Sequence, residues 1–105
     1  MALEKFKKQP WEEFVIAGSI EEVVDTGELI DIPNCDVTAV DMSDDSDSTA
    51  DVIDSPTIEK DDTLHYLKVR VKGGVDLEDH KITFKIATQD NNQYEIDVIM
   101  KVRET

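Results

Sequence analysis

The residues whose types suggest chemistry are concentrated in a run of aspartates and serines, "SDDSDS", at positions 43–48. Aspartate oxygens are preferred ligands of Ca²⁺, so Asp44, Asp45 and Asp47 are candidate calcium ligands. An EF-hand loop needs a glycine at its sixth position and a glutamate at its twelfth. Counting from Asp41 or from Asp45 meets neither requirement. The run therefore indicates either a looser acidic site or, as we favour, a solvated acidic loop.

Cys35 is the only cysteine, and with His65 or His80 it could form a nucleophile and its base. No flanking signature supports that reading, and the alternation of the segment places Cys35 on the same face as Val37. A small buried hydrophobe is the favoured interpretation. Two histidines and one cysteine also make a poor zinc set. We therefore expect no catalytic residues, no cofactor and no enzyme activity.

Three other features have a functional and a structural interpretation. Gly73-Gly74 does not open a helix, so we interpret it as a crossing between sheets and not as a phosphate cradle. Trp11 and Phe14 are interpreted as core or edge-covering groups in preference to a binding platform. The serines of the acidic run are conceivable phosphorylation sites in a flexible tract: Ser43, Ser46 and Ser48.

Composition limits the classes of partner. The 105 residues include 25 acidic and 11 basic side chains, a net charge of −14, with 39% apolar and 34% charged residues. This length predicts one domain with enough apolar residues for a core. The negative charge argues against nucleic acids and anionic membranes as partners, and it allows a basic protein partner.

The sequence carries no sign of export. "MALEKFKKQP" at the start has no apolar stretch, and no apolar run approaches the length of a membrane span. The single cysteine suits a reducing compartment. We therefore expect a protein that stays in the cytoplasm of a host cell or is incorporated there into a larger assembly.

The elements that would position these residues are clearest in the C-terminal half. Three segments alternate apolar and polar residues, which predicts half-buried antiparallel strands: "LHYLKVRVKG", "HKITFKIAT" and "QYEIDVIMKV". "QDNNQ" between the last two predicts a tight turn. Ile82→Asp or Val98→Asp should therefore unfold the domain.

The N-terminal half gives weaker patterns. Residues 1–10 are predicted to be a flexible segment that is frayed or forms a short helical turn. Phe14 to Ala17 is a predicted strand, a hairpin is expected around Thr26-Gly27 with a second turn at Pro33-Asn34, and Cys35 to Val40 is a further strand.

The region 41–62 differs in composition, with nine acidic residues and one basic residue. Mutual repulsion and few apolar groups predict an extended, mobile loop that carries a short strand around "ADVID". On that reading, removal of most of Asp44 to Ser48 should leave the thermal stability nearly unchanged.

Together these patterns predict an all-β fold, an antiparallel β-sandwich of about seven strands formed by residues 11–105. The bend from Asp76 to His80 resembles the corner before strand F of immunoglobulin-like domains. A tyrosine usually stands there and bonds back to the backbone. His80 could donate a similar bond from a ring nitrogen.

The order "GELI", "TAV", "VRVKGGVDLEDHKITFKIAT" and "YEIDVIMKVRE" resembles small immunoglobulin-like proteins encoded in the structural-gene clusters of tailed phages and prophages. These are sometimes described as fibre–tail or head–tail adaptor proteins. The resemblance covers Leu67 to Arg103 well and Gly27 to Arg103 loosely. It departs at Leu77, where a glycine is usual, at His80, at Asn91-Asn92 and in the long acidic insertion.

Such a resemblance implies a non-enzymatic β module that docks against other phage structural proteins in a virion tail or connector. It allows a homo-oligomer within an assembly and a monomer in isolation. Exposed sheet edges and the acidic loop would supply the contacts. The alternative is a stand-alone calcium- or carbohydrate-binding β-sandwich module that uses the acidic loop or an aromatic face.

Overall fold

The computed structural model describes residues 4–20, 27–61 and 65–104. These residues form eight β-strands and two short helical turns. The strands are β1 Glu4–Lys8, β2 Phe14–Ser19, β3 Asp36–Asp41, β4 Ser46–Asp47, β5 Ile53–Asp61, β6 Tyr66–Val71, β7 Asp79–Ala87 and β8 Gln93–Val102. The helical turns are the 3-10 helix η1 Ile32–Asn34 and the α-helix α1 Thr49–Val52. The all-β class predicted from the sequence is confirmed.

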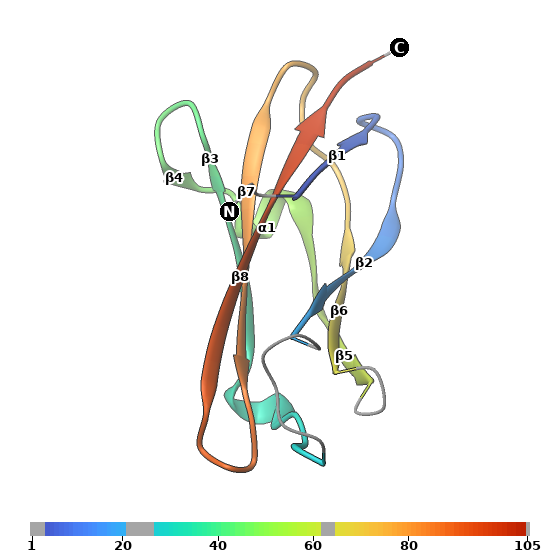
Figure 1. Ribbon diagram of the computed structural model, residues 1–105. Coiled ribbons are helices and arrows are strands. Elements are labelled where there is room, and N and C mark those ends of the chain that lie inside the picture. The colour runs from blue at the N-terminus through green and yellow to red at the C-terminus, as the bar shows by residue number, and fades with distance from the viewer. Residues whose placement is uncertain (1–3, 21–26, 62–64, 105) are drawn as a thin grey trace.

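The strands form two sheets that face each other (Figure 1). One sheet has the order β1-β8-β7-β3-β4 and the other has the order β2-β6-β5. Strand β1 runs parallel to β8, and the other paired strands are antiparallel. The chain changes sheets after β1, after β2, after α1 and after β6, so consecutive elements hold the two layers together.

The core lies between the layers and follows the alternation of the sequence. In β7 the side chains of Ile82, Phe84 and Ile86 are buried, while Lys85 between them is exposed. The same pattern in β6 and β8 supplies the facing side chains: Leu67, Val69, Val71, Val98, Met100 and Val102. The predicted strands in the C-terminal half are thus confirmed. When one face of a sheet is buried, an alternation of apolar and polar residues determines which side chains face the core.

Gly73 and Gly74 carry the chain from β6 in one sheet to β7 in the other, as predicted. Both have a positive φ, of 57° and 87°. A Cβ atom on Gly73 would lie 2.6 Å from the carbonyl oxygen of Asp51, and one on Gly74 would lie 2.7 Å from a methyl group of Val102. The two glycines allow the crossing to pass directly over α1 and β8.

The N-terminal segment differs from its prediction. Residues 4–8 form strand β1, not a frayed end or a helical turn. Phe6 points inward and packs edge-to-face on Phe14, with ring centroids 5.9 Å apart. Lys8 is 1% exposed, and its Nζ donates to the carbonyl oxygens of Gln9, Pro10 and Gly73 at 2.8, 3.2 and 2.6 Å. Burial lowers the pKa of the Lys8 ammonium. The two inward side chains fix the segment in the sheet.

The hairpin predicted around Thr26-Gly27 falls partly outside the described residues, because residues 21–26 are not among them. From Gly27 to Asn34, the structure has one isolated bridge, Ile30 to Thr88, followed by η1. The second arm of the predicted hairpin is therefore not a regular strand. Pro33 has no backbone N–H to offer a neighbouring strand, which favours the helical turn there.

The acidic segment is the main correction to the sequence prediction. Asp41 and Ser46 are paired, so the chain from β3 to β4 forms a hairpin and not an extended loop. The Asp41 carboxyl accepts hydrogen bonds from the N–H and hydroxyl of Ser43 at 2.9 and 2.8 Å. The predicted strand around "ADVID" is also displaced, since residues 49–52 are helical and β5 begins at Ile53. Repulsion between aspartates was the wrong criterion here, because their side chains bond locally to the backbone.

Because of these local bonds, the stability of the fold depends on pH in the acid range. The N–H and then the hydroxyl of Ser43 lower the pKa of the Asp41 carboxyl below its ordinary value of 3.8. A carboxyl whose pKa is lower in the folded state stabilises the fold above its unfolded pKa, and this contribution is lost as pH falls through the folded pKa. Asp41→Asn should therefore lower the melting temperature at neutral pH and flatten its decline below about pH 4.

Thermal melts across the acid range, monitored by circular dichroism, would check this. Asp90→Asn, in the exposed turn between β7 and β8, is the matched control for the loss of one carboxyl group. An Asp41→Asn profile parallel to that of the wild type would contradict the assignment.

Candidate functional site

A buried serine, a buried histidine and a glutamate form a chain of polar contacts beside the β3–β4 hairpin. The ring of His80 is 2% exposed. Its Nδ1 lies 2.8 Å from the hydroxyl of Ser48, and its Nε2 lies 3.1 Å from Oε1 of Glu78. Glu78 also accepts a 2.7 Å bond from the N–H of Val75. Because a carboxylate can only accept, Nε2 donates to Glu78, and the Ser48 hydroxyl, which can donate or accept, pairs with Nδ1.

The residue types match those of a hydrolase triad, but the arrangement does not support nucleophilic catalysis. In such triads Nε2 faces the serine and Nδ1 faces the acid, whereas here the two nitrogens are exchanged. Ser48 is only 4% exposed. The contacts instead connect the start of β7 to the segment between β4 and α1. The sequence suggested that His80 could donate a bond back to the backbone, whereas its described ring partners are two side chains.

The surroundings of the histidine are acidic. A cavity of about 430 Å³ lies over Ser48 and His80. Four of its lining residues carry carboxyl groups: Asp41, Asp47, Asp51 and Glu78. Negative charge developing on a reacting oxygen would be opposed there, not stabilised. The arrangement therefore supports a role in holding the hairpin against the sandwich.

The Ser48 contact yields a prediction that reverses the one made from the sequence. The N–H of Ser48 donates to the carbonyl oxygen of Ala39 at 2.9 Å, and its hydroxyl meets His80 in a buried position. Ser48→Ala should leave a buried ring nitrogen without its partner and cost roughly 1–3 kcal/mol of unfolding free energy. Removal of Asp44 to Ser48 should likewise destabilise the domain.

Urea titrations of the Ser48→Ala variant would measure the loss. Ser46→Ala is the matched control, because Ser46 is exposed and its hydroxyl bonds within the turn to Asp44 at 2.7 Å. Equal unfolding free energies for the two variants would show that the Ser48 contact contributes nothing.

The candidate calcium ligands are exposed on the β3–β4 hairpin. Asp44 accepts bonds from the N–H and hydroxyl of Ser46 at 3.0 and 2.7 Å, and Asp47 accepts from the N–H of Thr49 at 2.9 Å. Asp45 has a φ of 58° at the turn. Within the described residues, no group of three or more His, Cys, Asp or Glu side chains is arranged to hold a metal ion.

Cys35 is half-buried and packs against the core, as the alternation suggested. Its thiol donates to the carbonyl oxygen of Asp31 at 3.2 Å and accepts from the N–H of Ala87 at 3.4 Å. The contacts of His80 lie with Ser48 and Glu78, so Cys35 and His80 are not brought together as a nucleophile and base. These contacts tie the start of β3 to the end of β7.

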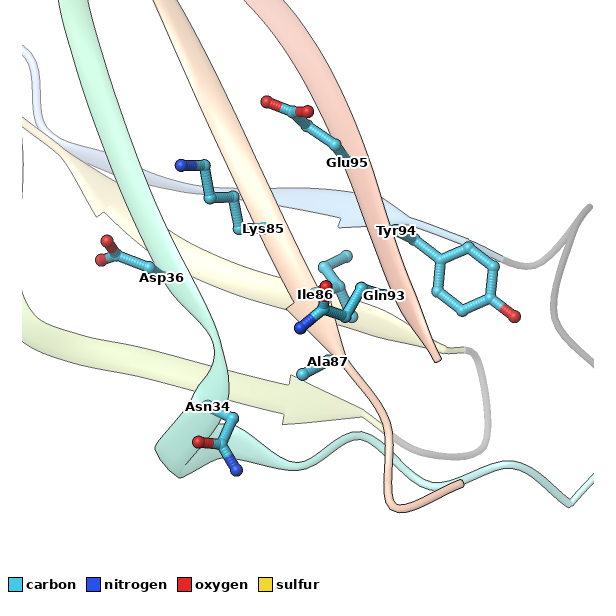
Figure 2. A pocket seen from close by; sticks show the side chains of 8 residues that line it. All are labelled: Asn34, Asp36, Lys85, Ile86, Ala87, Gln93, Tyr94 and Glu95. Carbon is cyan, nitrogen blue, oxygen red and sulfur yellow. The ribbon is translucent and has the colours of Figure 1, made fainter. Parts of the chain in front are cut away.

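A second cavity, of about 480 Å³, lies on the outer face of the larger sheet (Figure 2). Asp36, Lys85 and Glu95 occupy neighbouring positions across β3, β7 and β8 and point to the same side. The ring of Tyr94 points away from them. Charged and polar side chains make up most of the lining, and its apolar part is limited to Tyr94 and the buried Ile86 and Ala87. This composition is typical of a solvated sheet surface and not of a small-molecule site.

A buried carboxyl group that the sequence analysis did not single out lies behind Tyr94. Glu28 is 2% exposed, and three described side chains donate hydrogen bonds to it. Thr88 and Asn92 donate to Oε1 at 2.7 and 2.6 Å, and the hydroxyl of Tyr94 donates to Oε2 at 3.3 Å. The donors lie about sixty residues away along the chain, in and beside the β7–β8 turn. The signal in the sequence was the spacing: Glu28 stands two residues before the buried Ile30, and side chains two apart in an extended segment point to the same side.

The two candidate aromatic residues near the N-terminus differ in burial. Phe14 is half-buried and packs on the core, as predicted. Trp11 is 92% exposed, so its assignment to the core or to an edge-covering position is wrong. Trp11 lies in the turn in which the N–H of Glu12 donates to the carbonyl of Gln9 at 3.1 Å. This turn follows the end of β1 and leaves the indole exposed to solvent.

No protein-family model matches this chain, and no curated protein sequence matches it. Within the described residues, no helix is long and apolar enough to cross a membrane.

Proposed function

We propose that this chain is a non-enzymatic, immunoglobulin-like structural or adaptor protein of a phage or prophage, which acts through protein contacts in a virion tail or connector. The observation that carries the proposal is the strand order. Strands β1-β8-β7-β3-β4 face β2-β6-β5, with a parallel β1–β8 pair and a glycine crossing before β7. This order supports the immunoglobulin-like arrangement that the resemblance from Leu67 to Arg103 implies.

The edges of the sheets support a role in docking. Strands β1, β4, β2 and β5 lie at the four edges. The Arg103 N–H donates to the Lys8 carbonyl at 2.9 Å, which directs the backbone of Lys8 toward β8. In a parallel pair successive residues alternate in direction, so the backbone groups of Lys5 and Lys7 point away from β8. Such an edge can accept a strand from a partner.

The two polar clusters that the described residues form make structural contacts, which fits this role. The Ser48–His80–Glu78 contacts are buried under carboxyl groups, and the half-buried thiol of Cys35 contacts backbone atoms. Recognition by sheet edges and loops requires no reaction centre.

Mass spectrometry of purified particles, prepared after induction of a prophage that carries this gene, tests the proposal. We expect peptides of this chain in the particles at a ratio comparable to that of neighbouring tail or connector proteins. Tail proteins found without this chain would count against the proposal. A non-structural protein encoded in the same prophage should be absent and serves as the control.

A further inference from the structure

Exposed apolar side chains gather at one end of the sandwich. This end, called here the loop end, consists of residues 9–13, 42–45 and 72–78, which are all at the upper end of the sandwich in Figure 1. Six large hydrophobic side chains are exposed in the described part of the chain, and four of them belong to the loop end. These are Trp11 (92% exposed), Leu77 (76%), Val75 (65%) and Met42 (44%). Single exposed hydrophobic residues are ordinary, but a group at one end marks an interaction surface.

The backbone beneath these side chains is fixed. Lys8 Nζ binds the carbonyl oxygens of both Pro10 and Gly73, so it joins two of the three loops. The turn that carries Val75 and Leu77 is closed by the Glu78 N–H, which donates to the Val75 carbonyl at 3.1 Å. The Leu77 N–H donates to the Val102 carbonyl at 2.9 Å. A surface held in this way loses little conformational freedom when a partner binds.

The exposed side chain of Leu77 belongs to a residue with a strained backbone conformation. Its φ is 73°, in the left-handed region that favours glycine at the third position of such a turn. The side chain gains no burial in exchange, because it is 76% exposed. Burial among the described residues therefore does not offset this strain. Strain at an exposed residue points to a contact that forms outside the domain.

The charges of the loop end identify the kind of partner. Its three loops carry six carboxyl side chains and one lysine, Lys72. The acidic residues are Glu12, Glu13, Asp44, Asp45, Asp76 and Glu78. A second copy of this chain, with a net charge of −14, would place like charges against them. A surface with an apolar centre and a basic rim complements both the charges and the exposed side chains.

We propose that the loop end docks a basic protein surface with an apolar centre, and that Trp11 and Leu77 are its anchors. This inference rests on the proposed role in protein contacts and specifies the surface and the partner chemistry. The net negative charge would attract such a partner, and the apolar anchors would set how long it stays bound.

Trp11 is the only tryptophan, so its fluorescence reports directly on the loop end. We would titrate the protein with a synthetic peptide of alternating leucine and lysine, at physiological salt. A serine–lysine peptide controls for charge alone, and a leucine–glutamate peptide controls for apolar contact alone. We expect a saturable blue shift of the Trp11 emission with the leucine–lysine peptide, at least tenfold weaker binding of the serine–lysine peptide and no shift with the leucine–glutamate peptide.

Two variants separate the surface from the fold. Leu77→Gly should weaken binding of the leucine–lysine peptide about tenfold while keeping or raising the melting temperature, because glycine relieves the positive φ. Leu29→Ser, outside the loop end, should leave binding unchanged. Equal binding of the leucine–lysine and serine–lysine peptides, or undiminished binding by Leu77→Gly, would overturn the inference. Particles that lack this chain would refute the proposed function while leaving a positive titration in place, so the two failures are distinguishable.

Discussion

Replacing Ile82 with aspartate should leave the chain without a cooperative unfolding transition at room temperature. Ile82 is 0% exposed and lies at the centre of the larger sheet, paired with Ala39 on β3 and Val98 on β8. Losing the buried isoleucine costs about 2–5 kcal/mol. An unpaired carboxylate in its place costs several kcal/mol more. Together these terms are comparable to the total stability of a small domain, about 5–15 kcal/mol.

Val40→Asp is the matched control for this substitution. It makes the same change in charge on the outer face of the same sheet, and Lys81 lies opposite Val40 in the ladder. We expect this variant to fold, because an aspartate there is partly solvated and lies between the Lys81 cation on one side and the Asp47 carboxylate on the other, so its charge is neither strongly favoured nor strongly opposed. Circular dichroism and urea titration would compare the two. An Ile82→Asp protein that melts within a few degrees of wild type would show that Ile82 does not face the core.

The same period-two logic explains how much of the fold the sequence could predict. The strands from Tyr66 to Val102 alternate along most of their length, with Ile99 on β8 as an exception, and a one-residue shift would turn most of their apolar side chains outward. Their positions and facing were therefore predictable. Strand β1 was not, because its inward pair consists of Phe6 and a lysine. A lysine in a sequence pattern is expected to be exposed. The burial of Lys8 is favourable because carbonyl oxygens surround its ammonium group.

The prediction of a mobile loop in the acidic segment was wrong for a different reason. Composition counts charges and ignores which backbone groups they can reach. Asp41, Asp44 and Asp47 each accept a bond from the N–H two residues further on. Such local bonds stabilise turns, so a run of aspartates and serines that reads as disordered forms a compact hairpin instead.

The candidate sites were the least predictable part, because they depend on contacts between distant residues. Ser48 and His80 are thirty-two positions apart and meet only when β4 and β7 are in place. The exposed position of Trp11 likewise depends on the turn that follows β1. A single sequence contains the residue types of these contacts but not their pairing.

The second large effect should come from Glu28→Ala. The alanine would leave the Thr88 hydroxyl, the Asn92 amide and the Tyr94 hydroxyl without their common acceptor in a buried place. Hydrogen bonds to a charged group contribute about 1.5–3 kcal/mol each and are not additive. We expect a loss of about 3–5 kcal/mol in unfolding free energy, measured by urea titration.

Glu28 joins the chain before η1 to the β7–β8 turn, so its substitution tests how much this connection stabilises the domain. Glu28→Gln keeps an oxygen for Thr88 and Asn92, so it should lose less than half as much as alanine does. Glu95→Ala, on the exposed face of β8, should lose almost nothing. If Glu28→Ala and Glu95→Ala unfolded at the same urea concentration, the buried carboxyl would contribute no net stability. The end of the sandwich near η1 would then depend on its apolar contacts alone, chiefly those of Ile30 and Ile86.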